Sequence, residues 1–328
     1  IVCHTSESRA SNEVTPSSSS STSSDTFLFF LNSNNVTVSQ VGFPQKLCVT
    51  TSESPTSQMR RIASHDRIHL DVNESGGKKE KVFVITMDRG ENRVNPEFVN
   101  AMSRCLDVVE KAKHPKSLVL TGTGKFLSNG LDLDFVMGVD PKDSTLFLEG
   151  LWDLLSRLLV FECFTVCSIN GHGFGAGLFF AMACDYRIMR TKRGYLNFPE
   201  VNLGMRLQKQ FGELAKCKLA PGAVRGVRIF EHQHHSNTNA RAQQVRKAVL
   251  EAHRFSGDEA KEYGIVDEVV PLENLLSHSV KFALSKTPSK MKFMNFDPRN
   301  FKAIKMEMYT DAYRALSTKG LHNPSARL

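Results

Sequence analysis

A glycine-rich segment sets the architecture of this chain: Ile169-Asn-Gly-His-Gly-Phe-Gly-Ala-Gly177. A strand-like apolar run, Val166-Cys-Ser-Ile-Asn170, leads into it, and a run that is apolar on all sides, residues 178–184, follows it. Such an all-round apolar run is typical of a buried helix. The segment therefore predicts a strand, a tight turn and a buried helix, with backbone N–H groups and the positive end of the helix dipole facing a ligand.

A second glycine segment, Ser128-Asn-Gly-Leu-Asp132, closes another strand-like run at residues 117–121. Two backbone donors that converge on one carbonyl oxygen form an oxyanion hole. Further along, Phe198-Pro-Glu200 supplies a lone carboxylate. Taken singly, the glycines could serve tight helix packing and Glu200 could be a surface or N-cap carboxylate. Taken together, the three segments suggest two donors and one base.

The remaining pattern alternates strands and helices, which predicts an α/β fold. Order is expected to begin with a strand at residues 82–87. A helix is expected from the N-cap Asn95, with Pro96 at its first position, down to Lys113. The other expected elements are a helix at 146–159, a strand at 186–189 and a largely helical tail beyond residue 255.

The composition, 41% hydrophobic and 23% charged over 328 residues, is that of a globular protein with one large or two ordinary domains. No apolar run approaches the roughly 18–20 residues that cross a bilayer, so no membrane association is expected. The net charge of +8 suits nucleic acid or an anionic small ligand. Because Lys and Arg are scattered, without an RNA-binding or zinc-finger signature, nucleic acid is disfavoured. Seven cysteines without a CxxC pair indicate a reducing compartment.

Three regions are expected along the chain. Residues 1–58 are serine-rich and predict a disordered, targeting or artefactual segment. Residues 59–255 form the predicted core, in which the polar stretch 226–245 interrupts a helical pattern as an atypical insertion or an artefact. Residues 256–328 form a helical C-terminal region.

Two other kinds of site are weighed against the oxyanion hole and disfavoured. The segment Gly171-x-Gly173-x-x-Ala176 superficially matches a dinucleotide-binding turn. That turn needs an acidic residue about twenty positions on, where this chain has Thr191-Lys-Arg-Gly194. A zinc site is disfavoured as well, because no nearby Cys or carboxylate pattern completes a tetrahedral set with the three histidines of the insertion, His232, His234 and His235.

The motifs together resemble the enoyl-CoA hydratase/isomerase (crotonase) superfamily, and within it the peroxisomal Δ3,Δ2-enoyl-CoA isomerases of plants. The resemblance covers roughly residues 80–300. It implies a spiral of ββα units, as in ClpP-like folds, with a helical C-terminal region that builds trimers in relatives. The motifs that carry it are Gly124-Lys-Phe-Leu-Ser-Asn-Gly-Leu-Asp-Leu133, Ile169 to Gly177, Ala183-Cys-Asp-Tyr186, Phe198-Pro-Glu-Val-Asn-Leu-Gly204 and Gly264-Ile-Val-Asp267.

The resemblance also implies roles for single residues. The backbone N–H groups of Leu131 and Ala176 are the expected oxyanion donors, and Glu200 is the expected catalytic base. Hydratases of the superfamily use two glutamates, and at the first of those positions this chain has Phe179. The residues expected to bind substrate are Ser128, Asn129, Gly130, Asp132 and Gly175.

One carboxylate suffices to move a proton, whereas an apolar Phe179 does not orient water, so isomerisation is favoured over hydration. The expected reaction shifts a 3-cis or 3-trans double bond to 2-trans in an enoyl-CoA, with no cofactor and no metal, CoA being part of the substrate. The alternatives are hydration or another crotonase-type reaction of acyl-CoA, and a non-catalytic crotonase-fold protein that binds RNA.

The terminal residues Ala326-Arg327-Leu328 resemble a peroxisomal address of the Ser-Lys-Leu type. With an acyl-CoA site, they lead us to expect a peroxisomal protein that is recognised by the import receptor. The serine-rich N-terminus leaves an organelle transit peptide as the competing expectation. The expected assembly is a homotrimer, as in relatives.

Overall fold

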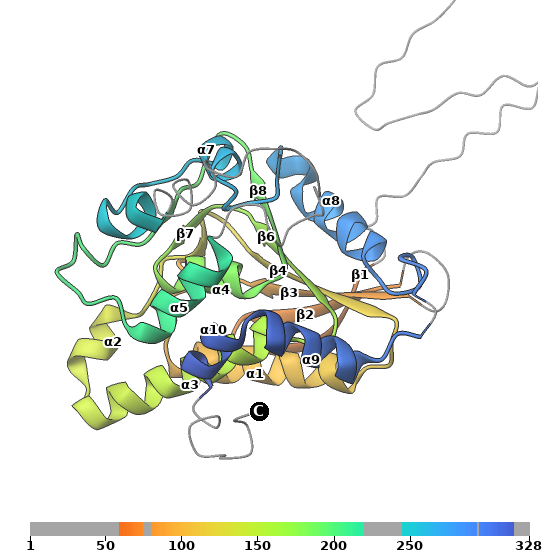
Figure 1. Ribbon diagram of the computed structural model, residues 1–328, viewed down its shortest axis with the longest axis horizontal. Helices are drawn as coiled ribbons and strands as arrows, with labels where there is room; N and C mark the ends of the chain where they lie inside the picture. The colour runs from red at the N-terminus through yellow and green to blue at the C-terminus, as the bar shows by residue number, and fades with distance from the viewer. Residues whose placement is uncertain (1–58, 75–79, 220–244, 294, 318–328) are drawn as a thin grey trace, which may run out of the picture. The chain divides into compact units, whose positions relative to one another are not determined.

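The computed structural model describes residues 59–74, 80–219, 245–293 and 295–317 (Figure 1). The segment 1–58, nearly all of the insertion 226–245 with its three histidines, and the terminal residues 326–328 lie outside these ranges. No helix among the described residues is long and apolar enough to span a membrane.

In the described residues, seven strands form the main sheet, in the order β1-β2-β3-β4-β6-β8-β10. The first three pair antiparallel, and from β3 to β10 every neighbouring pair is parallel. The strands are β1 Met59–His65, β2 Ile68–Asn73, β3 Lys81–Met87, β4 Lys116–Gly122, β6 Phe164–Ile169, β8 Tyr186–Arg190 and β10 Glu268–Val270.

A second, smaller sheet carries both glycine segments. It consists of three parallel strands in the order β5-β7-β9: β5 Phe126–Ser128, β7 His172–Phe174 and β9 Leu196–Asn197. Because neighbouring parallel strands end at the same edge, β5 brings Gly130 and β7 brings Gly175 to one place. The small sheet is therefore the element that assembles the predicted site.

Helices cover both faces of the main sheet (Figure 1). On one face, Val82 and Val84 of β3 pack against Leu275 and Val280 of α8. On the other face, the alternate residues of β3 pack with α1, α3 and α4 in the larger core. The helices are α1 Pro96–Lys111, α2 Leu133–Gly138, α3 Pro141–Leu159, α4 Ala176–Ala183, α5 Lys209–Lys218, a π-helical turn Arg246–Leu250, α7 Gly257–Glu262, α8 Leu272–Ser285, α9 Pro298–Met308 and α10 Thr310–Leu316.

Most of the expected elements are confirmed. The helix after Asn95 is α1, and the Asn95 side chain accepts a hydrogen bond from the Phe98 N–H at 3.0 Å. It ends at Lys111, two residues before the predicted end. Helix α3 begins at Pro141 rather than 146, because Asp140 caps it by accepting from the Lys142 N–H at 2.8 Å.

The prediction that order begins at residue 82 is wrong. Strands β1 and β2 precede it as a hairpin, and β2 alternates with period two: Ile68, Leu70 and Val72 are buried, and His69 and Asp71 lie between them. Strand β10 was also not predicted, since three residues carry little local signal. It forms because it pairs with β8, which is distant in sequence.

Candidate active site

Helix α4 begins inside the glycine-rich segment, as predicted. Gly175 is its N-cap, Ala176 is its first residue, and all eight of its residues are buried. Gly177 lets α4 pack directly on the other glycine segment, because a Cβ there would lie 2.5 Å from the Ser128 carbonyl oxygen. The Ala176 N–H is one of the first N–H groups of the helix, which have no acceptor within the helix itself.

The N–H of Leu131, the other predicted donor, is oriented by a short parallel bridge to Val94. The Val94 N–H donates to the Gly130 carbonyl at 2.8 Å, and the Asp132 N–H donates to the Val94 carbonyl at 2.9 Å. Because successive N–H groups of extended backbone point to opposite sides, the Leu131 N–H points away from Val94. Among the described residues, neither this N–H nor that of Ala176 donates a hydrogen bond.

The two glycine segments touch at Gly130. Its φ of +92° lies in the region that glycine favours, and a Cβ there would lie 3.0 Å from the Phe174 carbonyl oxygen and 3.7 Å from the Ala176 nitrogen. Pro199, from the third segment, lies next to Gly175, since a Cβ on Gly175 would lie 3.7 Å from the proline ring. The three segments singled out in the sequence therefore converge.

A small pocket of about 60 Å³ lies where they meet. It is lined mainly by apolar groups, and it brings together Glu200, Leu131, Ala176, Asn129, Gly130 and Gly175 of the predicted site. The further lining residues are Leu133, Phe179, Pro199, Leu203, Met205 and Phe211.

Glu200 is the ionisable side chain among these lining residues. Burial raises the pKa of its carboxyl above the ordinary value, and a hydrogen bond from its own backbone N–H offsets part of the rise. Its Oε2 atom is buried and has no hydrogen-bond partner within the described part of the chain. A carboxylate oxygen that is desolvated and free of partners is suited to accept a proton.

Comparison with known proteins shows which family the chain resembles. Residues 77–213 match the model of the enoyl-CoA hydratase/isomerase family. Over this segment the chain is similar to the enoyl-CoA hydratase/isomerase family. A similar curated protein is "Enoyl-CoA delta isomerase 2, peroxisomal" of Arabidopsis thaliana, 28% identical over 200 residues, which are 58% of this chain and 74% of that protein. "Enoyl-CoA hydratase, mitochondrial" of Pongo abelii is 25% identical, over 68% of this chain and 70% of that protein.

Solved structures confirm the predicted crotonase fold. Human mitochondrial delta3-delta2-enoyl-CoA isomerase superposes with a TM-score of 0.58 at 20% identity, covering 80% of this chain and 88% of that one. A probable enoyl-CoA hydratase of Mycobacterium tuberculosis superposes with a TM-score of 0.59 at 21% identity, covering 82% and 95%.

Phe179 fills the place where hydratases of the family, by the resemblance, carry their first glutamate. It is fully buried, stacks on Phe211 of α5 with ring centroids 4.3 Å apart, and packs against Phe198 at 4.7 Å. The wall facing Glu200 is therefore hydrocarbon. Asn129 is the other polar side chain of the lining, and its amide nitrogen donates to Glu91 at 3.2 Å.

Two predicted substrate-binding residues do not line the pocket. The Ser128 hydroxyl donates to the Asn92 carbonyl at 2.7 Å and accepts from the Gly130 N–H at 3.1 Å, inside the protein. Asp132 lies in a neighbouring open cleft, 3.8 Å from Arg93. The structure thus places both residues beside the pocket, and their contact with substrate stays a prediction.

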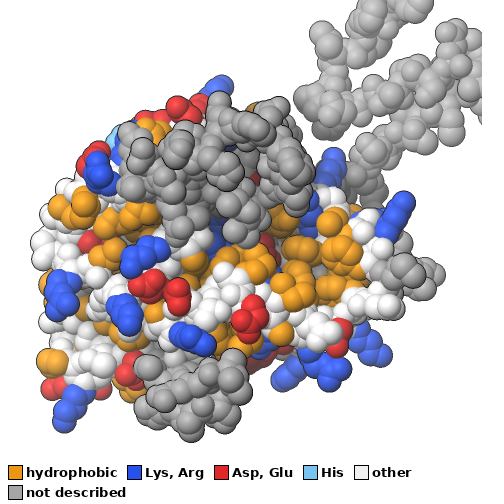
Figure 2. Space-filling model, viewed as in Figure 1, with side chains coloured by type: hydrophobic (Ala, Val, Ile, Leu, Met, Phe, Trp, Pro, Cys, Tyr) orange, Lys and Arg blue, Asp and Glu red, His pale blue; other side chains and the backbone are white. Residues whose placement is uncertain are grey.

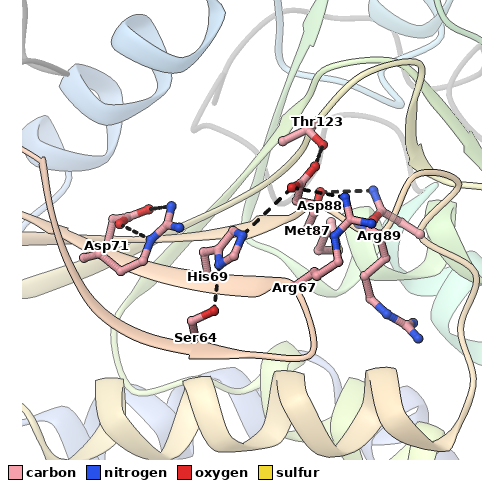
Figure 3. Close-up of polar contacts among 10 residues, drawn as sticks. Ser64, Arg67, His69, Asp71, Met87, Asp88, Arg89 and Thr123 are labelled. Carbon is pink, nitrogen blue, oxygen red and sulfur yellow. Dashed lines mark hydrogen bonds and ion pairs between the residues drawn. The ribbon is translucent and has the colours of Figure 1, made fainter.

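The sequence pattern did not single out residues 88–92, which follow strand β3. Figure 3 shows how this turn is tied at its start: Asp88 accepts from the Thr123 hydroxyl at 2.5 Å and lies 3.4 Å from an Arg67 nitrogen. The hydrogen bond from Thr123 is the main cause that lowers the pKa of Asp88. His69 extends the network toward Ser64 of β1, to which it is hydrogen-bonded at 2.9 Å.

No group of three or more His, Cys, Asp or Glu side chains in the described ranges could hold a metal ion. On the face drawn in Figure 2, Lys and Arg side chains are interspersed with Asp and Glu. The net charge of +8 is therefore not gathered into one basic surface on that face.

Proposed function

We propose that this chain is a Δ3,Δ2-enoyl-CoA isomerase, which shifts a 3-cis or 3-trans double bond to 2-trans in enoyl-CoA thioesters. The observation that carries the proposal is the Glu200 carboxylate, whose Oε2 lacks a partner among the described residues, in a pocket otherwise walled by apolar side chains and two backbone segments. The match to the family model over residues 77–213 and the similar delta isomerases of Arabidopsis thaliana support it.

In the proposed mechanism the thioester oxygen accepts hydrogen bonds from the N–H groups of Leu131 and Ala176. Glu200 removes a proton from C2, and the electron pair of that C–H bond forms a C1–C2 double bond as the carbonyl π pair moves to the thioester oxygen, which gives a dienolate. The same carboxyl then returns the proton to C4: the C3–C4 π pair takes the proton, the C1–C2 pair forms the C2–C3 double bond, and the thioester carbonyl re-forms. The two amides stabilise the negative oxygen, and removing one such donor typically costs about 2.7–4 kcal/mol of barrier. The reaction needs no cofactor, and CoA is part of the substrate.

The aromatic wall argues against hydration. Addition of water needs groups that hold and orient the water, and Phe179 presents a buried ring in contact with two further phenylalanines. A single carboxylate reaching both C2 and C4 satisfies the needs of proton transfer.

The test uses 3-hexenoyl-CoA and 2-hexenoyl-CoA with the full chain. We expect conversion of 3-hexenoyl-CoA to the 2-trans isomer, without water addition to 2-hexenoyl-CoA and without release of free CoA. Glu200→Gln should lower kcat by about 100- to 10,000-fold, the usual contribution of general acid–base catalysis. Glu97→Gln, at an exposed position of α1, is the matched control and should keep full activity. Full isomerase activity in Glu200→Gln would refute the assignment.

We further propose that the reaction serves β-oxidation of unsaturated fatty acids in the peroxisome, because two similar proteins of Arabidopsis thaliana are named as peroxisomal. A chain tagged at its N-terminus should co-localise with a peroxisomal marker. Accumulation in plastids or mitochondria would contradict this placement.

A further inference from the structure

Asn92 is a buried polar residue that no catalytic step above uses. Its side chain is fully enclosed, and its φ of +51° is a left-handed conformation that asparagine tolerates better than most residues. Its amide nitrogen lies 3.0 Å from the Leu127 carbonyl oxygen, 3.2 Å from that of Met87 and 3.3 Å from that of Phe126. Its side-chain oxygen accepts from the Arg89 N–H at 2.8 Å. One side chain thus joins the ends of β3 and β5.

The neighbours of Asn92 continue the same connection. We call residues 88–95 the brace and residues 127–132 the oxyanion loop. The Asn92 carbonyl accepts from the Ser128 hydroxyl, which in turn accepts from the Gly130 N–H. The Asn129 N–H donates to the Glu91 carbonyl at 2.8 Å. The hydrogen bonds of Gly130 and Asp132 with Val94 are the last of these contacts between the brace and the oxyanion loop.

In the segment from Asn129 to Asp132, the N–H groups of Asn129, Gly130 and Asp132 each donate a hydrogen bond, and the Leu131 N–H donates none to the described residues. The Gly130 carbonyl and the Asp132 N–H, on either side of it, are both hydrogen-bonded to Val94 of the brace. The brace therefore determines the direction in which the Leu131 N–H points. The Ala176 N–H has no such dependence, because helix α4 orients it.

We propose that Asn92 is a positioning residue of the oxyanion hole, which acts by holding the oxyanion loop so that the Leu131 N–H faces the thioester oxygen. This inference rests on the proposed function and adds a residue to it. A displaced donor loses transition-state stabilisation much more than it loses ground-state binding. Removal of the side chain should therefore lower kcat and leave KM nearly unchanged.

The test variant is Asn92→Gly, because glycine adopts a φ of +51° without strain and loses only the side-chain contacts. We expect kcat for 3-hexenoyl-CoA to fall roughly 10- to 100-fold, with KM within threefold. A second readout is bound acetoacetyl-CoA, whose enolate absorbs in the near ultraviolet and carries its charge on the same oxygen. The pKa of bound acetoacetyl-CoA should rise by about one unit in Asn92→Gly relative to the unaltered chain.

Two further variants separate positioning from stability. Thr121→Val removes a buried hydrogen bond to the Ser168 carbonyl in the main sheet and should lower Tm without changing kcat. Ser128→Ala removes the link between Asn92 and the Gly130 N–H and should reproduce part of the kcat loss. It replaces Asn92→Gly as the test variant if Asn92→Gly fails to fold. The inference is overturned if Asn92→Gly and Ser128→Ala both keep kcat within twofold of the unaltered chain and the pKa of bound acetoacetyl-CoA within 0.3 units of it. An unaltered chain that neither isomerises 3-hexenoyl-CoA nor shifts the acetoacetyl-CoA pKa overturns the proposed function instead.

Discussion

The two proposed oxyanion donors are built in different ways. Ala176 is the first residue of a regular buried helix, so its N–H direction follows from helix geometry. Leu131 lies in an irregular loop whose direction depends on residues 91–94, which come from another part of the chain. One donor is a local consequence of its own segment, and the other is a product of tertiary contacts. The two should therefore respond differently to mutation.

The largest effect is expected where the two donors share one contact. In Gly177→Val, the new side chain would overlap the Ser128 carbonyl oxygen, which lies 2.5 Å from the Cβ position, and would push the helix away from the oxyanion loop. We expect destabilisation of about 3 kcal/mol, the upper end for overpacking, and loss of measurable isomerase activity. Urea unfolding and turnover of 3-hexenoyl-CoA measure both. Near-normal activity would mean that the donors do not depend on this contact.

The pH dependence separates the base from both donors, since backbone amides do not titrate in the accessible range. In the proposed mechanism Glu200 must be ionised to accept a proton, so kcat/KM should fall about tenfold per pH unit below the raised pKa of this carboxyl. The stability effect has the opposite sign: the folded state binds the proton more tightly than the unfolded chain. The unaltered chain should lose stability relative to Glu200→Gln as pH rises from about 4.3 through the raised pKa, and the difference should then stay constant.

Unfolding curves of the two proteins between pH 4 and pH 8 check this linkage. An increase in the stability of the unaltered chain over that range, relative to Glu200→Gln, would show that the carboxylate is held by partners and is not a desolvated base.

A smaller effect is expected at the loop donor alone. Gly130→Ala places a side chain at a φ of +92°, which costs roughly 1–2 kcal/mol, with its Cβ 3.0 Å from the Phe174 carbonyl oxygen. We expect kcat to fall about tenfold through the Leu131 donor while helix α4 stays in place. If the variant still binds acetoacetyl-CoA, measured by titration, the loss of kcat comes from the Leu131 donor. An equal loss of binding and of kcat would contradict an effect that is confined to this donor.

The smallest effect is expected at the outer edge of the brace. Glu91 accepts from the Asn129 side chain at 3.2 Å and pairs with Arg93, but it is 44% exposed. Since exposed ion pairs contribute about 0–1 kcal/mol, Glu91→Gln should change kcat less than threefold and Tm by no more than a few degrees. A loss of kcat as large as that expected for Asn92→Gly would show that Glu91, and not Asn92, is the main residue that positions the oxyanion loop.

The sequence alone predicted the parts of the fold and site that depend on neighbours in the chain. The N-cap Asn95 with Pro96, the all-apolar helix α4 and the strands at the centre of the main sheet follow from local spacing and burial, and the structure confirms them. The resemblance to the family followed from the glycine motifs, which lie within the segment that matches the family model, and the solved structures confirm the fold. The roles of Glu200, Leu131 and Ala176 remain predictions that the geometry makes testable.

Other features depend on contacts between distant segments, which a single sequence does not display. Strand β10 exists by pairing with β8, and Asn92 acquires its partners only when the ends of β3 and β5 meet. The sequence therefore determined which residues can donate, accept or pack, because those properties belong to each side chain and its near neighbours. Only the tertiary structure decided which of them face the pocket, since backbone direction and burial arise from segments that the fold brings together.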